Sequence, residues 1–321
     1  MRFKRLFLSL FISLLLPVTV LAYSDKVILG GQNIGIEVKT KGVLVVGLYK
    51  VDDKYIARDS GIEAGDYIVK VNNNDVKSID DFTKEINNDS DKELIDITYS
   101  RNKKIYNTSL KLYKENDDYK TGLYVKDKVN GIGTLTMVDP ANKRFIALGH
   151  QIQDSVTNTI LNIDSGSIYE SIITGISKSS NGSPGEKEAT TNINEKYGTI
   201  TDNTLKGIYG YYEKELNSNL IEVANPDEIV LGSASIFTVI DQDNVKEYSI
   251  NIEKIDKKDD LKNILFTITD EELLYSTGGI IQGMSGSPIV QNNKLVGAVT
   301  HVIVDDCKKG YGIFITKMLD E

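Results

Sequence analysis

Hydrophobic and polar positions alternate in short runs over much of the chain, which is the pattern of half-buried β-strands. Between residues 30 and 113, alternating or β-branched apolar runs lie at 34–38, 42–48, 94–100 and 105–112. A helical period begins at Ser78, which can cap a helix that places Phe82 and Ile86 on one face. We therefore expect residues 30–113 to form a small β-rich domain that contains one helix.

The second half of the chain is again strand-rich. Short apolar stretches lie at 131–138, 145–148, 229–240, 264–269 and 295–304. Few segments have a helical period, so residues 119–321 are expected to form an all-β barrel or a pair of sandwiches. The polar residues 114–118 between the two regions are expected to be a linker.

The N-terminus has the layout of a secretory signal. Three basic residues within the first five precede an uncharged run over residues 6–22, which ends in Val20-Leu21-Ala22. This run is short for a membrane span, which needs about 20 apolar residues. We expect residues 1–22 to be a signal peptide cleaved near Ala22, and the alternative is an uncleaved signal anchor. In either case the remaining chain is exported.

The composition of the chain limits the kinds of metal site, disulfide and ligand that it can have. Hydrophobic residues make up 40% and charged residues 26%, as in soluble globular proteins. The chain has one Cys and two His, which excludes an intrachain disulfide and any thiolate-rich metal site and leaves little room for a histidine-built one. We therefore expect no metal and no cofactor. The net charge of −9 disfavours non-specific nucleic-acid binding.

The sequence G-M-S-G-S-P at residues 283–288 favours a nucleophilic serine. Glycines allow a tight turn and let a substrate carbonyl approach the backbone closely. The N–H groups of Gly283 and Ser285 can then converge as an oxyanion hole. The simpler alternative is a Gly-Ser hairpin turn between two strands.

A nucleophilic serine needs a base, and the chain offers two histidines. His150 directly follows an apolar strand, where a rigid element can present it to a substrate. His301 lies inside an apolar strand and is expected to be buried and hydrogen-bonded. A carboxylate would complete the set, and Asp270, Asp154 and Asp164 all remain candidates, because acidic residues are abundant.

The first domain resembles a PDZ domain. The resemblance rests on G-I-E-A-G-D-Y-I-V-K-V-N at residues 61–72 and on the single helix after it. It implies that an extended peptide, including a C-terminal tail, adds as a strand beside a carboxylate-binding loop near Gly42, Val43, Leu44 and Val45. The alternative is a small sandwich in which Gly and Asp only make turns.

The whole pattern resembles the stage IV sporulation protein B peptidases of endospore-forming bacteria. Matching stretches are V-L-V-V-G at 43–47, G-I-G-T-L-T at 131–136, A-L-G-H at 147–150, G-G-I-I-Q-G-M-S-G-S-P-I at 278–289 and A-V-T-H-V at 298–302. The resemblance implies a mainly β fold, with a PDZ domain over 30–113 followed by a chymotrypsin-like double β-barrel serine peptidase domain over 119–321. It also implies that His150 is the general base, Ser285 the nucleophile and Asp270 the acidic partner, with Asp154 as the alternative.

The same resemblance implies a role in sporulation signalling. The exported endopeptidase would cut itself and the exposed part of a membrane regulatory protein, in the space between the forespore and mother-cell membranes. That cut would free an intramembrane protease to process a late sigma factor. The chain itself would meet the membrane only through its signal segment or its substrate. Two alternatives remain: a non-catalytic export-side PDZ scaffold, and a peptidase that uses Cys307, which sits in a charged turn with His301 as the nearest histidine in sequence.

Overall fold

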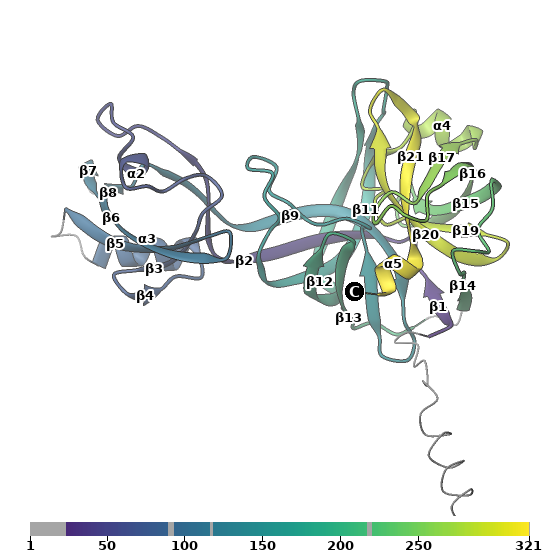
Figure 1. The fold of residues 1–321 in the computed structure, drawn as a ribbon, viewed down its shortest axis with the longest axis horizontal. Coiled ribbons are helices and arrows are strands. Elements are labelled where there is room, and N and C mark those ends of the chain that lie inside the picture. Colours follow the sequence, from purple (N-terminus) through teal and green to yellow (C-terminus); the bar gives the residue numbers. More distant parts are fainter. Residues whose placement is uncertain (1–23, 89–92, 116–117, 217–219, 321) are drawn as a thin grey trace, which may run out of the picture.

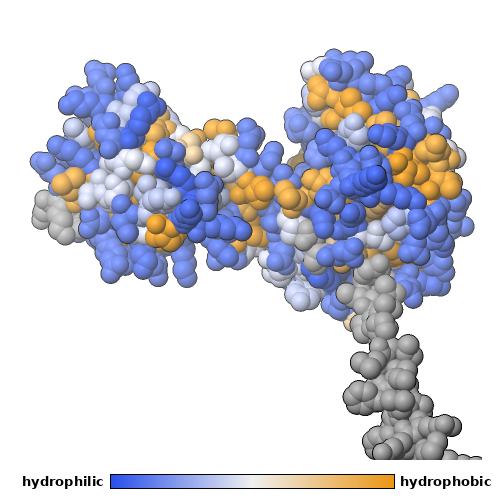
Figure 2. Space-filling model, viewed as in Figure 1, coloured by the Kyte–Doolittle hydropathy of each residue, from blue (hydrophilic) through white to orange (hydrophobic). Residues whose placement is uncertain are grey.

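A computed structural model describes residues 24–88, 93–115, 118–216 and 220–320 of the chain. The predicted signal segment, residues 1–22, lies outside the described residues. The fold is mainly β and has two lobes, joined by the long strands β2 (Asn33–Leu48) and β9 (Leu123–Val138) (Figure 1). On the face shown in Figure 2, hydrophilic residues cover most of both lobes, which narrow to a waist between them.

The small lobe surrounds the predicted helix. Its elements are α2 (Ile56–Asp59), β3 (Tyr67–Val71), β4 (Asn74–Asp75), α3 (Ile79–Asn88), β5 (Leu94–Arg101), β6 (Lys104–Lys111), β7 (Tyr113–Glu115) and β8 (Asp118–Lys120). Ser78 and Asp81 cap α3 reciprocally, because the N–H of each donates to the side chain of the other at 3.1 Å. Phe82 and Ile86 face inward and pack with Val45, so the helix prediction is confirmed.

The large lobe contains two buried cores and a bridge between them. Its other elements are β1 (Lys26–Leu29), β10 (Arg144–Ala147), β11 (Ile163–Ser177), β12 (Gly185–Thr204), β13 (Gly207–Tyr212), β14 (Leu220–Val223), β15 (Gly232–Val239), β16 (Val245–Ile255), β17 (Ile264–Ile268), α4 (Glu271–Thr277), β18 (Ile281–Gln282), β19 (Pro288–Gln291), β20 (Lys294–Ile303), β21 (Asp306–Phe314) and α5 (Ile315–Leu319). The first core includes Phe145 and Ile208, and the second includes Phe266 and Ile289. A smaller cluster around Ile146 joins the two halves. Two separate cores agree with the predicted double barrel.

Strand β2 crosses from one lobe to the other. Residues 33–39 pair with β9 on one edge, and residues 34–40 pair with β11 on the other edge. Residues 43 and 44 pair instead with β3 in the small lobe. The start of the segment predicted as the PDZ domain, 30–113, is therefore built into the large lobe. The lobes are joined by β2 and β9 and not by the predicted polar linker, since β7 and β8 form a hairpin there.

Within the described ranges, no helix combines the length and apolar character needed to cross a membrane.

Candidate active site

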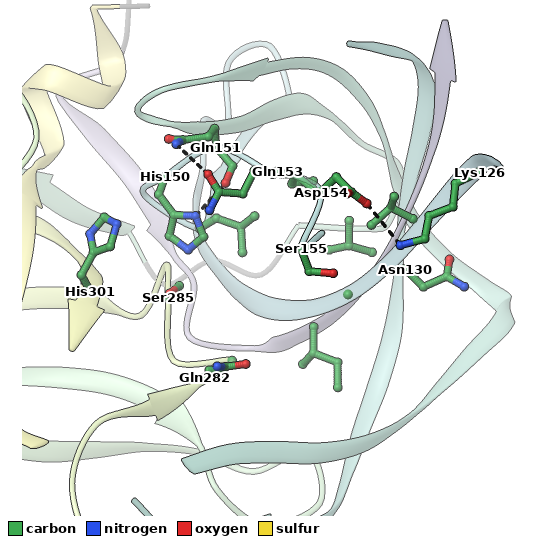
Figure 3. Close-up of a pocket in the computed structure, with 17 residues that line it drawn as sticks. Lys126, Asn130, His150, Gln151, Gln153, Asp154, Ser155, Gln282, Ser285 and His301 are labelled. Atoms are coloured by element: carbon green, nitrogen blue, oxygen red, sulfur yellow. Dashed lines mark hydrogen bonds and ion pairs between the residues drawn. The ribbon is translucent and has the colours of Figure 1, made fainter. Parts of the chain in front are cut away.

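A cavity of about 500 Å³, which we call the central cavity, is lined by residues of both halves of the large lobe. His150 follows β10 in the first half. Ser285 lies in the loop between β18 and β19, and His301 lies in β20 of the second half. Figure 3 shows the three side chains on the same side of the cavity. The fold thus brings together the predicted nucleophile and both histidines, although Ser285 is 135 residues from His150 in the sequence.

The loop that carries Ser285, residues 283–287, makes a turn that needs glycine at two positions. Gly283 and Gly286 both have a φ of +93°, in the left-handed region. A side chain at Gly286 would also clash with the Thr134 carbonyl. Thr134 of β9 holds the turn, because its N–H donates to the Ser285 carbonyl at 2.9 Å and its hydroxyl donates to the Gly283 carbonyl at 2.8 Å.

This anchoring leaves two backbone donors available. No hydrogen bond within the described residues uses the N–H of Gly283 or of Ser285. Buried N–H groups usually find a partner, so two free ones on a single turn beside a cavity are unusual. They are the donors that an oxyanion hole needs, and the sequence prediction names the same two groups.

The Ser285 hydroxyl donates a hydrogen bond to the Thr300 carbonyl at 3.0 Å. Ser285 is partly buried, and Thr300 lies on β20 directly before His301. A hydroxyl has one proton to donate. Ser285 must therefore leave the Thr300 carbonyl before its proton can pass to an imidazole.

His150 is held in one tautomer. Its Nδ1 lies 2.8 Å from the Gln151 carbonyl oxygen, which can only accept, so Nδ1 carries the proton. Neutral His150 then has Nε2 available as an acceptor. Burial lowers the pKa of His150, and the bond to Gln151 opposes that shift only in part. At neutral pH His150 is therefore uncharged, which is the state that a general base requires.

His301 also faces the central cavity. The centres of the two imidazole rings are 5.5 Å apart. Partial loss of water contact lowers the pKa of His301, and the nearby His150 contributes to the shift. The prediction of a buried His301 was wrong, because β20 reaches the cavity rim there: Thr300 is 3% exposed, whereas His301 is exposed.

Asp270 lies outside the central cavity. It caps α4, since its carboxylate accepts from the Leu273 N–H at 2.9 Å and from the Ser249 N–H at 3.3 Å. The structure therefore does not join Asp270 to His150, and the predicted role as acidic partner is not supported. The Gln151 carbonyl occupies the corresponding position on the ring.

Asp154, the alternative, lines the central cavity but is committed to other groups. It is 1% exposed, and it accepts from the Thr157 N–H at 2.8 Å and from the Lys126 amine at 3.2 Å. Burial alone would raise the pKa of Asp154, but these bonds lower it below its usual range. Asp164, the remaining candidate, is exposed on β11 and does not line the cavity.

Replacing Asp270 with alanine is expected to affect folding more than catalysis. Loss of a helix N-cap lowers the free energy of unfolding by about 1 kcal/mol, which corresponds to a Tm lower by roughly 2–4 °C in a domain of this size. The kcat of the folded variant should fall by less than about tenfold. Thermal unfolding and peptidase assays measure the two effects, with Asp164→Ala as a matched surface control. A large loss of kcat at unchanged Tm would return Asp270 to the catalytic set.

Comparison with known families identifies the large lobe. The model of the SpoIVB peptidase S55 matches residues 117–319, which contain the Ser285 loop and both histidines. The chain belongs to the SpoIVB peptidase S55 family. A PDZ domain model matches residues 32–112. The protein is therefore a serine peptidase with a PDZ domain, and the predicted mainly β fold, with a PDZ domain followed by a serine peptidase domain, is confirmed.

Some solved structures resemble parts of this S55 peptidase. The Rv3671c protease from M. tuberculosis, in its active form, is 15% identical over 60% of this chain and 72% of that chain, with a TM-score of 0.36. An HtrA-type protease solved with a decapeptide is 13% identical over 61% of this chain and 51% of that chain, with a TM-score of 0.35. The PDZ domain of an SdrC-like protein from Listeria monocytogenes is 23% identical over 27% of this chain and 90% of that chain, with a TM-score of 0.24. No curated protein sequence matches the chain significantly.

The predicted carboxylate-binding loop of the PDZ domain is closed. Val43, Leu44 and Val45 are fully buried. Val43 and Leu44 pair with β3, while Leu44 and Val45 pair with β9, so both strand edges are occupied. A peptide adds to an unpaired edge. The prediction that Gly42–Val45 binds the ligand was therefore wrong, because β9 returns from the peptidase domain alongside this strand.

A different groove of the PDZ domain is open. A cavity of about 270 Å³ lies between α3 and residues 118–125. Phe82 and Ile86 of α3 form its apolar wall, and Val125 of β9 faces them. The sequence pattern did not indicate this groove, because its strand wall lies beyond the segment predicted as the PDZ domain.

Cys307 lies outside the central cavity. It is buried, and its thiol lies 3.5 Å from the Gly278 carbonyl oxygen, so the alternative with a cysteine nucleophile finds no support. Over the described part of the chain, no group of three or more His, Cys, Asp or Glu side chains is arranged to hold a metal ion. The residues that sequence reasoning missed are Thr134, Gln151 and Thr300. Gln151 and Thr300 contribute backbone carbonyls, which residue type does not reveal.

Proposed function

We propose that Ser285 is the nucleophile and His150 the general base of this serine peptidase. One observation carries the proposal: a single cavity contains a neutral imidazole whose Nδ1 is already fixed and a serine on a turn whose Gly283 and Ser285 N–H groups have no partner among the described residues. These are the three components that acyl transfer from a peptide requires.

The reaction follows from the positions of these groups. His150 Nε2 takes the Ser285 proton while Oγ attacks the substrate carbonyl, and the N–H groups of Gly283 and Ser285 stabilise the negative oxygen. The carbon–nitrogen bond then breaks, and His150 gives its proton to the leaving amine. Water attacks the acyl-enzyme and passes a proton to His150, which returns it to Ser285 as the acid product leaves.

The partner of His150 in this mechanism is a neutral carbonyl. A carboxylate stabilises an imidazolium by charge, whereas the Gln151 carbonyl does so only through its dipole. Asp154 lies in the same cavity, but Lys126 and the backbone of its own turn already satisfy its charge. The Gln151 carbonyl therefore has mainly an orienting role, which keeps Nε2 free for the serine proton.

The biological role that we propose is sporulation signalling. Membership of the SpoIVB peptidase S55 family supports cleavage of the chain itself and of an exported segment of a membrane regulatory protein. That cleavage would activate an intramembrane protease that processes a late sigma factor. The signal layout of residues 1–22 supports export into the space between the forespore and mother-cell membranes. The PDZ domain would hold a peptide of the substrate or of the chain itself.

Complementation tests this role. In an endospore-forming host that lacks this chain, the wild-type protein is expected to restore self-cleavage, cleavage of the regulatory protein and processing of the sigma factor. Ser285→Ala should be exported and accumulate uncleaved without restoring any of the three. Full restoration of processing by Ser285→Ala would contradict the proposal and support the non-catalytic PDZ scaffold instead.

A further inference from the structure

The turn between β12 and β13 is hydrogen-bonded to the segment that follows His150. Asn203 lies near the end of β12 and is partly buried. Its Oδ1 accepts from the Ile152 N–H at 2.7 Å, and its Nδ2 donates to the Ile152 carbonyl at 2.9 Å and to the Leu161 carbonyl at 3.0 Å. Every one of these contacts is more than 40 residues away in the sequence, so the side chain does not serve its own turn.

One of these bonds reaches the peptide group that holds His150. The Ile152 N–H and the Gln151 carbonyl belong to the same planar peptide unit. Asn203 therefore holds one side of this unit, while its other side accepts the proton of His150 Nδ1 at 2.8 Å. Hydrogen bonds linked through one amide polarise each other, so the bond that the Ile152 N–H donates to Asn203 also strengthens the Gln151 carbonyl as an acceptor for His150.

The frame around this chain of bonds is rigid. β13 begins at Gly207 and pairs with β10, the strand that leads to His150. A side chain at Gly207 would lie 2.6 Å from the Ala147 carbonyl oxygen, so the turn is packed directly against that strand. Asn203 itself pairs with Ile208 of β13, which pairs with Ala147 of β10, so its backbone is tied to the strand that leads to His150.

We propose that Asn203 is a positioning residue of the peptidase and acts on His150 through the Gln151–Ile152 peptide group. The Gln151 carbonyl takes the place that the sequence prediction gave to an aspartate, and Asn203 supports this carbonyl from the other side of the peptide group, without charge. The inference rests on the proposed role of His150 as the base. It adds no chemical step: Asn203 keeps the Nδ1–H tautomer and so keeps Nε2 available for the Ser285 proton.

The test compares Asn203→Ala and Asn203→Asp with Asp202→Ala, a control on the neighbouring exposed side chain. Asn203→Ala is expected to lower kcat by up to about 100-fold with little change in KM, because His150 loses its orientation. Asn203→Asp keeps the acceptor for the Ile152 N–H and adds charge. It should therefore recover part of kcat and move the acidic limb of the pH profile to higher pH. Asp202→Ala should match the wild type.

Imidazole ¹⁵N NMR reports the tautomer of His150, which a loss of folding stability alone would not change. The wild type should show the His150 proton on Nδ1, and Asn203→Ala a mixture of the two tautomers. The inference is overturned if Asn203→Ala retains wild-type kcat and tautomer, or if Asn203→Asp loses as much kcat as Asn203→Ala without a shift of the pH profile. Full activity in His150→Ala would instead overturn the proposed function, so the two failures are distinguishable.

Discussion

Ser285→Ala is expected to lower kcat for peptide cleavage by at least about 10³-fold while the protein remains folded. The substitution removes the attacking oxygen and one hydrogen bond, to the Thr300 carbonyl, in a partly buried position. The anchoring of the loop by Thr134 uses the Gly283 and Ser285 carbonyls and is unaffected. Single-turnover assays on a protein substrate, together with thermal unfolding, separate the loss of chemistry from a loss of structure.

Ser287 provides the matched control. It lies two residues further along the same loop, but it is fully buried, and its hydroxyl is 3.5 Å from the Thr134 hydroxyl. Ser287→Ala should therefore keep kcat within about tenfold of the wild type. Persistent cleavage by Ser285→Ala together with inactivity of Ser287→Ala would show that the nucleophile was assigned to the wrong serine.

The second large effect distinguishes the catalytic roles of the two histidines. His150→Ala is expected to reduce kcat by at least about 10³-fold, whereas His301→Ala should reduce it by less than about tenfold. Only His150 has a fixed Nδ1 proton, through the Gln151 carbonyl, and thus a defined acceptor nitrogen. Self-cleavage and turnover of a peptide substrate measure both variants. Equal large losses in the two variants would contradict the assignment of a single base.

The pH profile checks the same assignment. A general base works in its neutral form, and burial holds the pKa of His150 below the usual value of about 6.5. As the pH falls, the wild type should therefore keep its activity to below pH 6.5 and then lose it as His150 becomes protonated. His301→Ala should leave this acidic limb largely unchanged, because burial and the Gln151 carbonyl, and not His301, set the pKa of His150. A midpoint above pH 7 would contradict a desolvated base.

Sequence alone pointed to Ser285 and to both histidines, which the structure brings to one cavity, because their signals are local. Glycines at 283 and 286 mark a turn with unusual backbone angles, and only two histidines were available to serve it. The sequence did not reveal that the partner of His150 is a carbonyl, since every residue has one. The family resemblance implied a catalytic role for Asp270. Its position before Glu271, Glu272 and an apolar pair is equally typical of a helix N-cap, and the structure supports the cap.

The strands of the fold were also largely predictable, but their partners were not. Alternation over residues 34–38 and the apolar run over 42–48 indicated two strands of a PDZ domain. In the structure they form one strand, β2, that pairs in both lobes. A period of two residues shows which side chains share a face and not which strand lies alongside. For the same reason, the closure of the Gly42–Val45 edge by β9 was not visible in the sequence.

Labelling with a serine-directed fluorophosphonate shows whether His150 activates Ser285, because the reagent reacts only with a serine that a base has activated. We expect one label per chain, located at Ser285 by peptide mass spectrometry, lost in His150→Ala and retained in His301→Ala and Cys307→Ala. A label at Ser287, or full labelling of Ser285 in the absence of His150, would contradict it.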